Sequence, residues 1–195
     1  MPNVLECGNW VYWQDNPLSG GSQNSLNIGS HMMEKARKFA IERHGVQKYG
    51  DYPYSFHLDA VANIASEYGD EAITIAYLHD VVEDTQTTID EIETEFGRLI
   101  SQCVHVLTDE PGADRKERKA KTYAKMSKVS GELELALIVK AADRLANFRS
   151  CVAQNNIERL KTYIKEQQAF REAAYRPNLC DPLWKEIEAL AAFGP

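Results

Sequence analysis

The chain has 195 residues, with 29 acidic and 22 basic side chains and a formal net charge of −7. This mildly acidic balance argues against a nucleic-acid-binding protein, because such proteins normally carry a basic face. No segment is long and apolar enough to span a bilayer, so no membrane partner is expected. Composition leaves the oligomeric state open.

Residues 1–32 are predicted to be an expression tag, a linker or an engineered peptide. Residues 29–32 read GSHM, like the scar of a cleavable tag, and a second start, Met33, follows at once. Residues 33–195 are then expected to form one domain, long enough to bury a core. Its cysteines show no close pairing or metal-type spacing, which favours a reducing, cytoplasmic setting. They are Cys103, Cys151 and Cys180.

Hydrophobic periodicity predicts an all-α fold, a single helical bundle of about seven or eight helices without a convincing strand. The first helix is expected from Glu34 to His44, where Gly45 ends it. A turn-rich loop, residues 48–54, then leads to a second helix beginning near His57. A third helix is expected over residues 71–82.

Later helices follow in the same way. Thr88 and Glu91 have the spacing of a capping box, which opens a fourth helix ending at Phe96. The basic stretch 115–121 is interpreted as a solvated helix face rather than a phosphate clamp. The remaining helices are expected at residues 99–107, at 132–148 (the most apolar and therefore central one), at 157–174 and at 182–193.

The third helix ends in an unusual concentration of ligand-type side chains. Residues 76–85 place His79, Asp80, Glu83 and Asp84 in an otherwise apolar run. On a continuous helix, residues four apart share one face, so the four groups would converge on one side. Buried charges must be paired, solvated or coordinated, and a divalent cation meets that need directly.

Several ordered motifs resemble those of the HD-domain metal-dependent phosphohydrolases. More narrowly, the chain resembles the hydrolase domain of Rel/SpoT-type enzymes and the stand-alone small alarmone hydrolases. Pro53-Tyr54 followed by His57 is similar to their PYxxH segment, and residues 78–85 read LHDVVEDT. Further matches follow in order, at Phe96-Gly97, at residues 106–109 and at residues 139–147. A bare HD doublet is weak evidence, whereas this ordered set spans most of residues 34–163.

The resemblance implies a metal site formed by His57, His79, Asp80 and Asp143, usually holding manganese. Two imidazoles and two carboxylates leave open positions on a six-coordinate ion, where a water and a phosphate oxygen can bind. Affinity alone does not select manganese, because other divalent ions bind such groups more tightly. The resemblance also makes Glu83 and Asp84 the carboxylates that position and deprotonate the attacking water.

The expected activity is hydrolysis of a nucleotide pyrophosphate ester, first of all (p)ppGpp to its 5′-nucleotide plus pyrophosphate. Alternatives are another HD-type nucleotide phosphohydrolase, such as a nucleotidase or an NADPH-type phosphatase, and a non-catalytic nucleotide-binding protein. With no synthetase or regulatory segment following, only hydrolysis is expected. The side chains expected to contact the substrate are Lys48, Tyr49, Lys140, Arg144, Asn147 (at a ribose hydroxyl), Arg159 and Tyr163.

The chain departs from these relatives before and after the PY segment. Where they usually carry an Arg-Lys pair that grips guanine, this chain has Lys48-Tyr49, and Leu58 replaces the usual proline after the histidine. Tyr49 or Tyr52 could stack on a base without reading its edge. Two other histidines lie outside these motifs: His44 is either a pocket residue or a structural one, and His105 is taken as structural.

Overall fold

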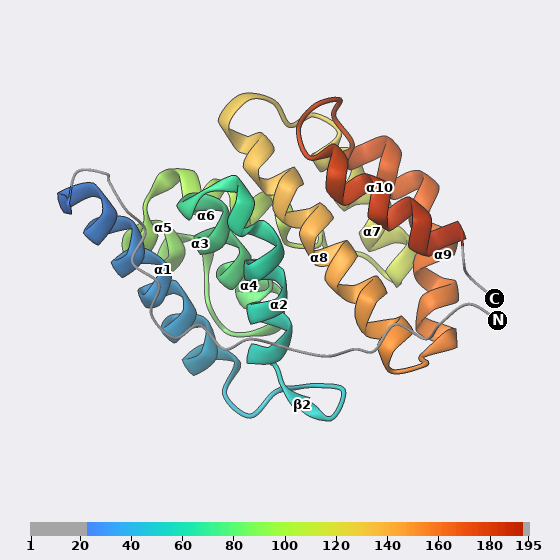
Figure 1. The fold of residues 1–195 in the computed structure, drawn as a ribbon, viewed down its shortest axis with the longest axis horizontal. Helices are drawn as coiled ribbons and strands as arrows, with labels where there is room; N and C mark the ends of the chain where they lie inside the picture. Colours follow the sequence, from blue (N-terminus) through green and yellow to red (C-terminus); the bar gives the residue numbers. More distant parts are fainter. Residues whose placement is uncertain (1–22, 193–195) are drawn as a thin grey trace.

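The computed structural model describes residues 23–192, with side chains from residue 29 onward (Figure 1). The first helix, α1 (Gln23–His44), begins well before its expected start at Glu34 and includes residues 29–32. Residues 1–22 of the expected leader lie outside the described residues. Buried Ala36 and Ala40 let α1 pack closely on α3. No helix in the described part of the chain is long and apolar enough to cross a membrane.

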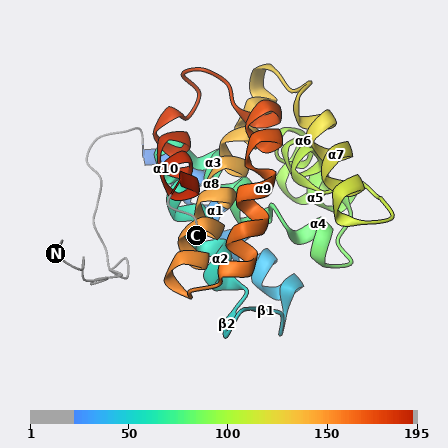
Figure 2. The same ribbon diagram turned by 90° about the vertical axis from the view of Figure 1, so that its right-hand side faces the viewer.

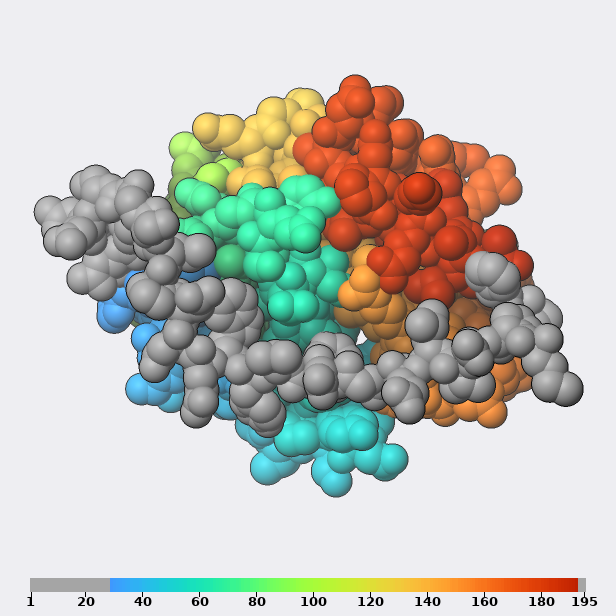
Figure 3. Space-filling view, in the orientation of Figure 1, coloured from blue at the N-terminus to red at the C-terminus, as the bar shows by residue number. Residues whose placement is uncertain are grey.

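A small hairpin occupies the segment that was expected to be only a turn-rich loop. Strands β1 (Lys48–Tyr49) and β2 (Tyr52–Pro53) pair antiparallel, with Tyr49 opposite Tyr52. Gly50 supplies the positive φ of +61° that the tight turn requires. Figures 1 and 3 show the hairpin projecting from the lower edge of the helical body. It leads into α2 (Ser55–Ala65) and the one-turn 3₁₀ helix η1 (Ser66–Tyr68).

The third predicted helix is broken at the HD doublet. It forms α3 (Asp70–Leu78) and the single turn α4 (Val81–Asp84), with His79 and Asp80 between them. The Asp80 backbone has φ −105° and ψ −4°, in the sparsely populated bridge region where many active-site residues lie. The expectation of one continuous helix through residue 82 was therefore wrong.

Two short amphipathic helices and a basic one follow. Thr88 caps α5 (Ile89–Phe96) by accepting the Glu91 N–H at 3.2 Å, as the capping-box spacing predicted. After α6 (Arg98–Leu107), the basic stretch forms α7 (Arg115–Met126), which begins at an Asp114 cap that accepts the Glu117 N–H at 2.8 Å.

The centre of the molecule is α8 (Glu134–Ala153), preceded by the 3₁₀ turn η2 (Gly131–Leu133). It is buried on nearly every face and packs against α2, α3, α6, α9 and α10, which confirms its predicted central place. Helices α9 (Ile157–Ala174) and α10 (Asp181–Ala192) cover its other side, and α7 packs on α9 (Figures 1 and 2). The all-α prediction is confirmed. Because α2, α3 and α6 pack on one side of α8 and α9 and α10 on the other, side chains from both groups of helices can meet at the surface of α8.

Candidate active site

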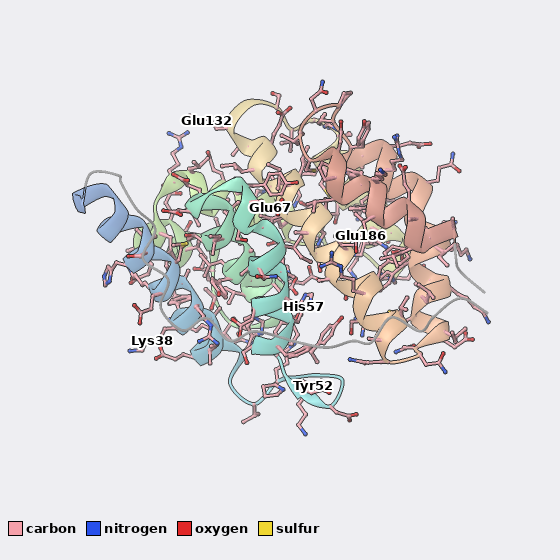
Figure 4. All side chains as sticks on the ribbon, in the orientation of Figure 1. Lys38, Tyr52, His57, Glu67, Glu132 and Glu186 are labelled. Carbon is pink, nitrogen blue, oxygen red and sulfur yellow. The ribbon has the colours of Figure 1, made fainter. Side chains whose placement is uncertain are left out.

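Four side chains from three parts of the chain meet on the hairpin side of α8. We call His57, His79, Asp80 and Asp143 the ligand cluster. The Nε2 atoms of His57 and His79 are 3.3 Å apart, and an Asp143 Oδ1 lies 3.4 Å from His57 Nε2 and 3.8 Å from His79 Nε2. Asp80 Oδ2 lies 2.9 Å from His79 Nε2 and 3.7 Å from His57 Nε2. Figure 4 shows His57 near the hairpin end of α2, inside the helical body.

A backbone carbonyl fixes how His79 faces this cluster. His79 Nδ1 lies 2.7 Å from the carbonyl oxygen of Ala76, one turn earlier. A carbonyl can only accept, so Nδ1 carries the hydrogen and, in the neutral ring, Nε2 presents its lone pair to the cluster. Metal-binding histidines are normally oriented by such a bond on the opposite ring nitrogen.

The electrostatics of the cluster favour bound positive charge. Burial would lower the pKa of His57, but hydrogen bonds to Asp143 and Asp80 raise it to about 9. Burial likewise opposes ionisation of Asp80, yet the His79 and His57 rings hold its pKa well below the usual range. The pKa of Asp143 is also lowered, with Lys140 Nζ 3.2 Å from its Oδ2. Two ionised carboxylates beside the two facing imidazole nitrogens form a donor set that fits a divalent cation, and the donor atoms of His57, His79 and Asp80 all lie within 4.8 Å of one another.

Glu83 and Asp84 lie at the end of α4 and line the same pocket as the cluster. Each is held by a group from elsewhere in the chain. Glu83 Oε2 accepts the backbone N–H of Asp109 at 3.2 Å, and Asp84 Oδ2 accepts Gln47 Nε2 at 2.8 Å. Burial raises the pKa of Glu83, the direction that suits a carboxylate acting as a proton acceptor.

A largely buried ion pair supports the loop that holds Glu83. Lys119 Nζ lies 2.8 Å from Asp109 Oδ2 and 2.9 Å from Oδ1, with 15% and 5% of the two side chains exposed. Thr122 also donates to Asp109 Oδ1 at 3.2 Å. Burial lowers the pKa of Lys119, and nearby Lys140 lowers it further, whereas Asp109 raises it. Helix α7 therefore contributes a partly buried cation to the site and is not only a solvated face.

The pocket above the cluster has a volume of about 310 Å³. It is lined by acidic groups on the α4 side and by cations from α7, α8 and α9. All the side chains expected to contact substrate line it, namely Lys48, Tyr49, Lys140, Arg144, Asn147, Arg159 and Tyr163. The pocket is also lined by Glu83, by Asp84 and by every member of the ligand cluster except His79, which is buried.

Asn147 is the centre of a hydrogen-bond network that uses its whole amide group. Its Oδ1 accepts the hydroxyls of Tyr49 at 2.8 Å and Tyr163 at 3.1 Å. Its Nδ2 donates to both the backbone oxygen and Oδ1 of Asp143. A ribose hydroxyl could bind Asn147 only by displacing one of these partners, so here Asn147 orients Asp143.

Tyr49 is stacked on a cluster histidine. Its ring lies 4.6 Å from that of His57 with an interplanar angle of 11°. In this arrangement one face of the Tyr49 ring is already covered by an imidazole. Tyr52, the other aromatic candidate for base stacking, is exposed, stacks on Phe56 and lies outside the pocket, as its outward position in Figure 4 illustrates.

The two predicted arginines differ in their surroundings. Arg159 Nε donates to Tyr163 OH at 2.9 Å, so the predicted pair on one helical face is present. Arg144 is buried between the rings of Tyr163 and Phe170, 4.9 and 4.4 Å from their centroids. Its Nη2 donates to Tyr123 OH at 3.1 Å, which places Arg144 mainly within the wall of the pocket.

Sequence reasoning did not assign a role in the site to Gln47, Tyr54 or Tyr123, which line the pocket and contact predicted site residues. Arg115 and Lys119, from the basic stretch interpreted as a solvated face, also line it, and Arg115 forms a two-point pair with Glu166. Tyr54 lies inside the PYxxH segment and donates to Asp80 Oδ2 at 2.6 Å. The others gave no local signal, because their partners are distant in the sequence.

Comparisons with known proteins identify the family of the chain. A family profile for the HD domain matches residues 36–174. The GTP pyrophosphokinase rsh of Brucella ovis is 33% identical over 171 residues, 85% of this chain and 23% of that protein. The chain thus spans less than a quarter of such curated relatives.

Shorter relatives also match. The guanosine-3′,5′-bis(diphosphate) 3′-pyrophosphohydrolase MESH1 of Xenopus tropicalis is 38% identical over 131 residues, 64% of this chain and 72% of that protein. A solved structure of a metazoan ortholog of SpoT, described as hydrolysing ppGpp, superposes with a TM-score of 0.64. It covers 89% of this chain and 96% of its own at 21% identity, which shows the shared fold. The chain therefore belongs to the HD-domain family.

Proposed function

We propose that the protein is a manganese-dependent pyrophosphohydrolase that removes pyrophosphate from the 3′ position of (p)ppGpp. One observation carries this proposal: three members of the ligand cluster (His57, Asp80 and Asp143), the Glu83-Asp84 carboxylates and several cations line one pocket, with His79 buried directly behind it. The relatives named 3′-pyrophosphohydrolases support the same reaction. The buried free thiols of Cys103, Cys151 and Cys180 are compatible with a reducing compartment such as the cytoplasm.

The ligand cluster would hold the ion through His57, His79, Asp80 and Asp143. When bound, a divalent ion there lowers the pKa of a water ligand and polarises a phosphate oxygen. Manganese suits mixed imidazole and carboxylate donors with positions left open for substrate. Metal content after reconstitution, measured together with activity for manganese, zinc and magnesium, tests this choice.

The chain's own side chains supply the rest of the reaction. Glu83 and Asp84 orient the attacking water and accept its proton. The water oxygen bonds to the phosphorus attached to the ribose 3′-oxygen. The bond between this phosphorus and the 3′-oxygen breaks, and the 3′-oxygen takes up the proton. Lys140, Arg159 and Arg115 stabilise the negative charge of the departing pyrophosphate. In ppGpp the products are GDP and pyrophosphate.

A second candidate is a phosphatase acting on an adenine dinucleotide such as NADPH. The sequence motivates it, because Lys48-Tyr49 stands where the alarmone hydrolases that the chain resembles usually carry an Arg-Lys pair that grips guanine, and no such pair selects guanine here. The full chain should be incubated with manganese and each of ppGpp, pppGpp, the adenine analogue, NADPH and nucleoside monophosphates. Pyrophosphate release from ppGpp supports the first candidate, and turnover of monoesters alone would exclude it.

A further inference from the structure

His44 is a buried residue of α1 outside the ligand cluster, only 6% exposed. Its ring stacks on that of Tyr54, with centroids 4.3 Å apart and an interplanar angle of 21°. Its Nδ1 lies 2.9 Å from Gln47 Oε1, and its Nε2 is buried without a hydrogen-bond partner among the described residues. Each of the two contacted residues reaches a carboxylate of the site.

The direction of each hydrogen bond follows from Asp84. An ionised carboxylate only accepts, so the Gln47 atom 2.8 Å from Asp84 Oδ2 is the amide nitrogen. The other end of the amide is then an oxygen, which requires a hydrogen on His44 Nδ1. A neutral His44 therefore has the Nδ1–H tautomer, and its unpartnered Nε2 is a lone pair rather than a buried, unpaired N–H.

The second contact of His44 leads to the ligand cluster. Tyr54, on which it stacks, donates its hydroxyl to Asp80 Oδ2 at 2.6 Å. Burial raises the pKa of Tyr54, and the negative charges of Asp80 and Asp84 raise it further, so Tyr54 remains a donor. One histidine of α1 thus fixes the partner of Asp84 by a hydrogen bond and the partner of Asp80 by packing.

We propose that His44 and Gln47 are positioning residues that orient Asp84 toward the attacking water. The inference rests on the proposed function, because it concerns the same carboxylate. Removing such a supporting hydrogen bond next to a metal site typically costs 10- to 100-fold in activity or metal affinity. Because Gln47 holds Asp84 and no member of the ligand cluster, its loss should lower kcat and leave the metal Kd unchanged.

Substitutions at the two residues separate positioning from simple packing. Gln47→Leu is expected to lower kcat by about tenfold, the smaller of those losses, with KM nearly unchanged. In His44→Asn the amide nitrogen can take the place of Nδ1, whereas in His44→Gln it reaches the position of Nε2. His44→Asn should therefore retain more kcat than His44→Gln. His105→Gln, at an exposed position on α6, is the control and should match the wild type.

A double-mutant cycle tests whether the effect passes through Asp84. In an Asp84→Asn background, Gln47→Leu should cause little further loss, because the group that it orients has already changed. Fully multiplicative losses, or equal kcat for His44→Asn and His44→Gln, would overturn the inference.

Imidazole ¹⁵N NMR of the full chain gives a readout independent of turnover. His44 should show the Nδ1–H tautomer, and Gln47→Leu should remove that preference. An Nε2–H tautomer in the wild type would overturn the positioning role of His44 and Gln47 even if ppGpp is hydrolysed. Inactivity of the wild type toward the whole substrate panel would instead reject the proposed function. The tautomer of His44 would still show whether it donates to Gln47 as proposed.

Discussion

Replacing Lys119 by methionine tests whether the largely buried pair with Asp109 supports the site. The substitution keeps most of the side-chain volume but leaves a carboxylate that is 5% exposed without its cation. Removing one partner of a buried pair costs about 3–5 kcal/mol. Because Thr122 still donates to Asp109 and Lys119 is 15% exposed, we expect the lower end, about 3 kcal/mol.

Urea denaturation followed by circular dichroism measures this loss. With an m-value of about 2 kcal/mol per molar urea, the midpoint should fall by about 1.5 M. The double variant Lys119→Met with Asp109→Asn should recover part of the loss, because the uncompensated charge is gone. Lys121→Met, which breaks an exposed pair with Glu117 on the same helix, should cost less than about 1 kcal/mol. Equal shifts for Lys119→Met and Lys121→Met would refute the reasoning.

Four further outcomes are expected. Asp80→Ala should abolish metal binding in calorimetry, and retained stoichiometric binding would contradict its place in the ligand cluster. Glu83→Ala should keep the metal but lose about 100-fold or more in kcat, so full activity would exclude its role as base. Glu83 must be ionised to accept a proton, so kcat/KM should fall as the pH drops through its raised pKa. Lys119 lowers the pKa of Glu83, so Lys119→Met should raise it. The fall of kcat/KM on the acid side of the pH profile should then move to higher pH. Metal at about 100 times its Kd should add about 2.7 kcal/mol of stability, which a chelator should reverse in a thermal melt.

Local patterns were sufficient for most of the helices. The helix at residues 157–174 has its predicted bounds, and α5 begins at the predicted Thr88 cap. These features depend on periodicity and on capping side chains within a few residues, which the chain displays directly. The all-α class and the central position of α8 follow from the same information.

Features that depend on distant partners could not be predicted in this way. The helix break at Asp80 coincides with contacts to Tyr54 and His57, more than twenty residues earlier. The hydrogen bonds that Asn147 accepts from Tyr49 and Tyr163 exist only in the folded chain, so no local pattern indicated that its amide group is engaged. The residues that line the site were thus largely predictable, whereas the residues that hold them in place were not.

The order of the ligand cluster along the chain has a consequence for biosynthesis. Three of its members lie within residues 57–80, whereas Asp143 belongs to α8. A growing chain emerges from the ribosome with its N-terminal part first, so it carries three metal-binding side chains long before the fourth. We expect a nascent chain to retain an ion firmly only after the central helix has been made and has packed. Ion capture would then mark the packing of the central helix rather than the beginning of folding.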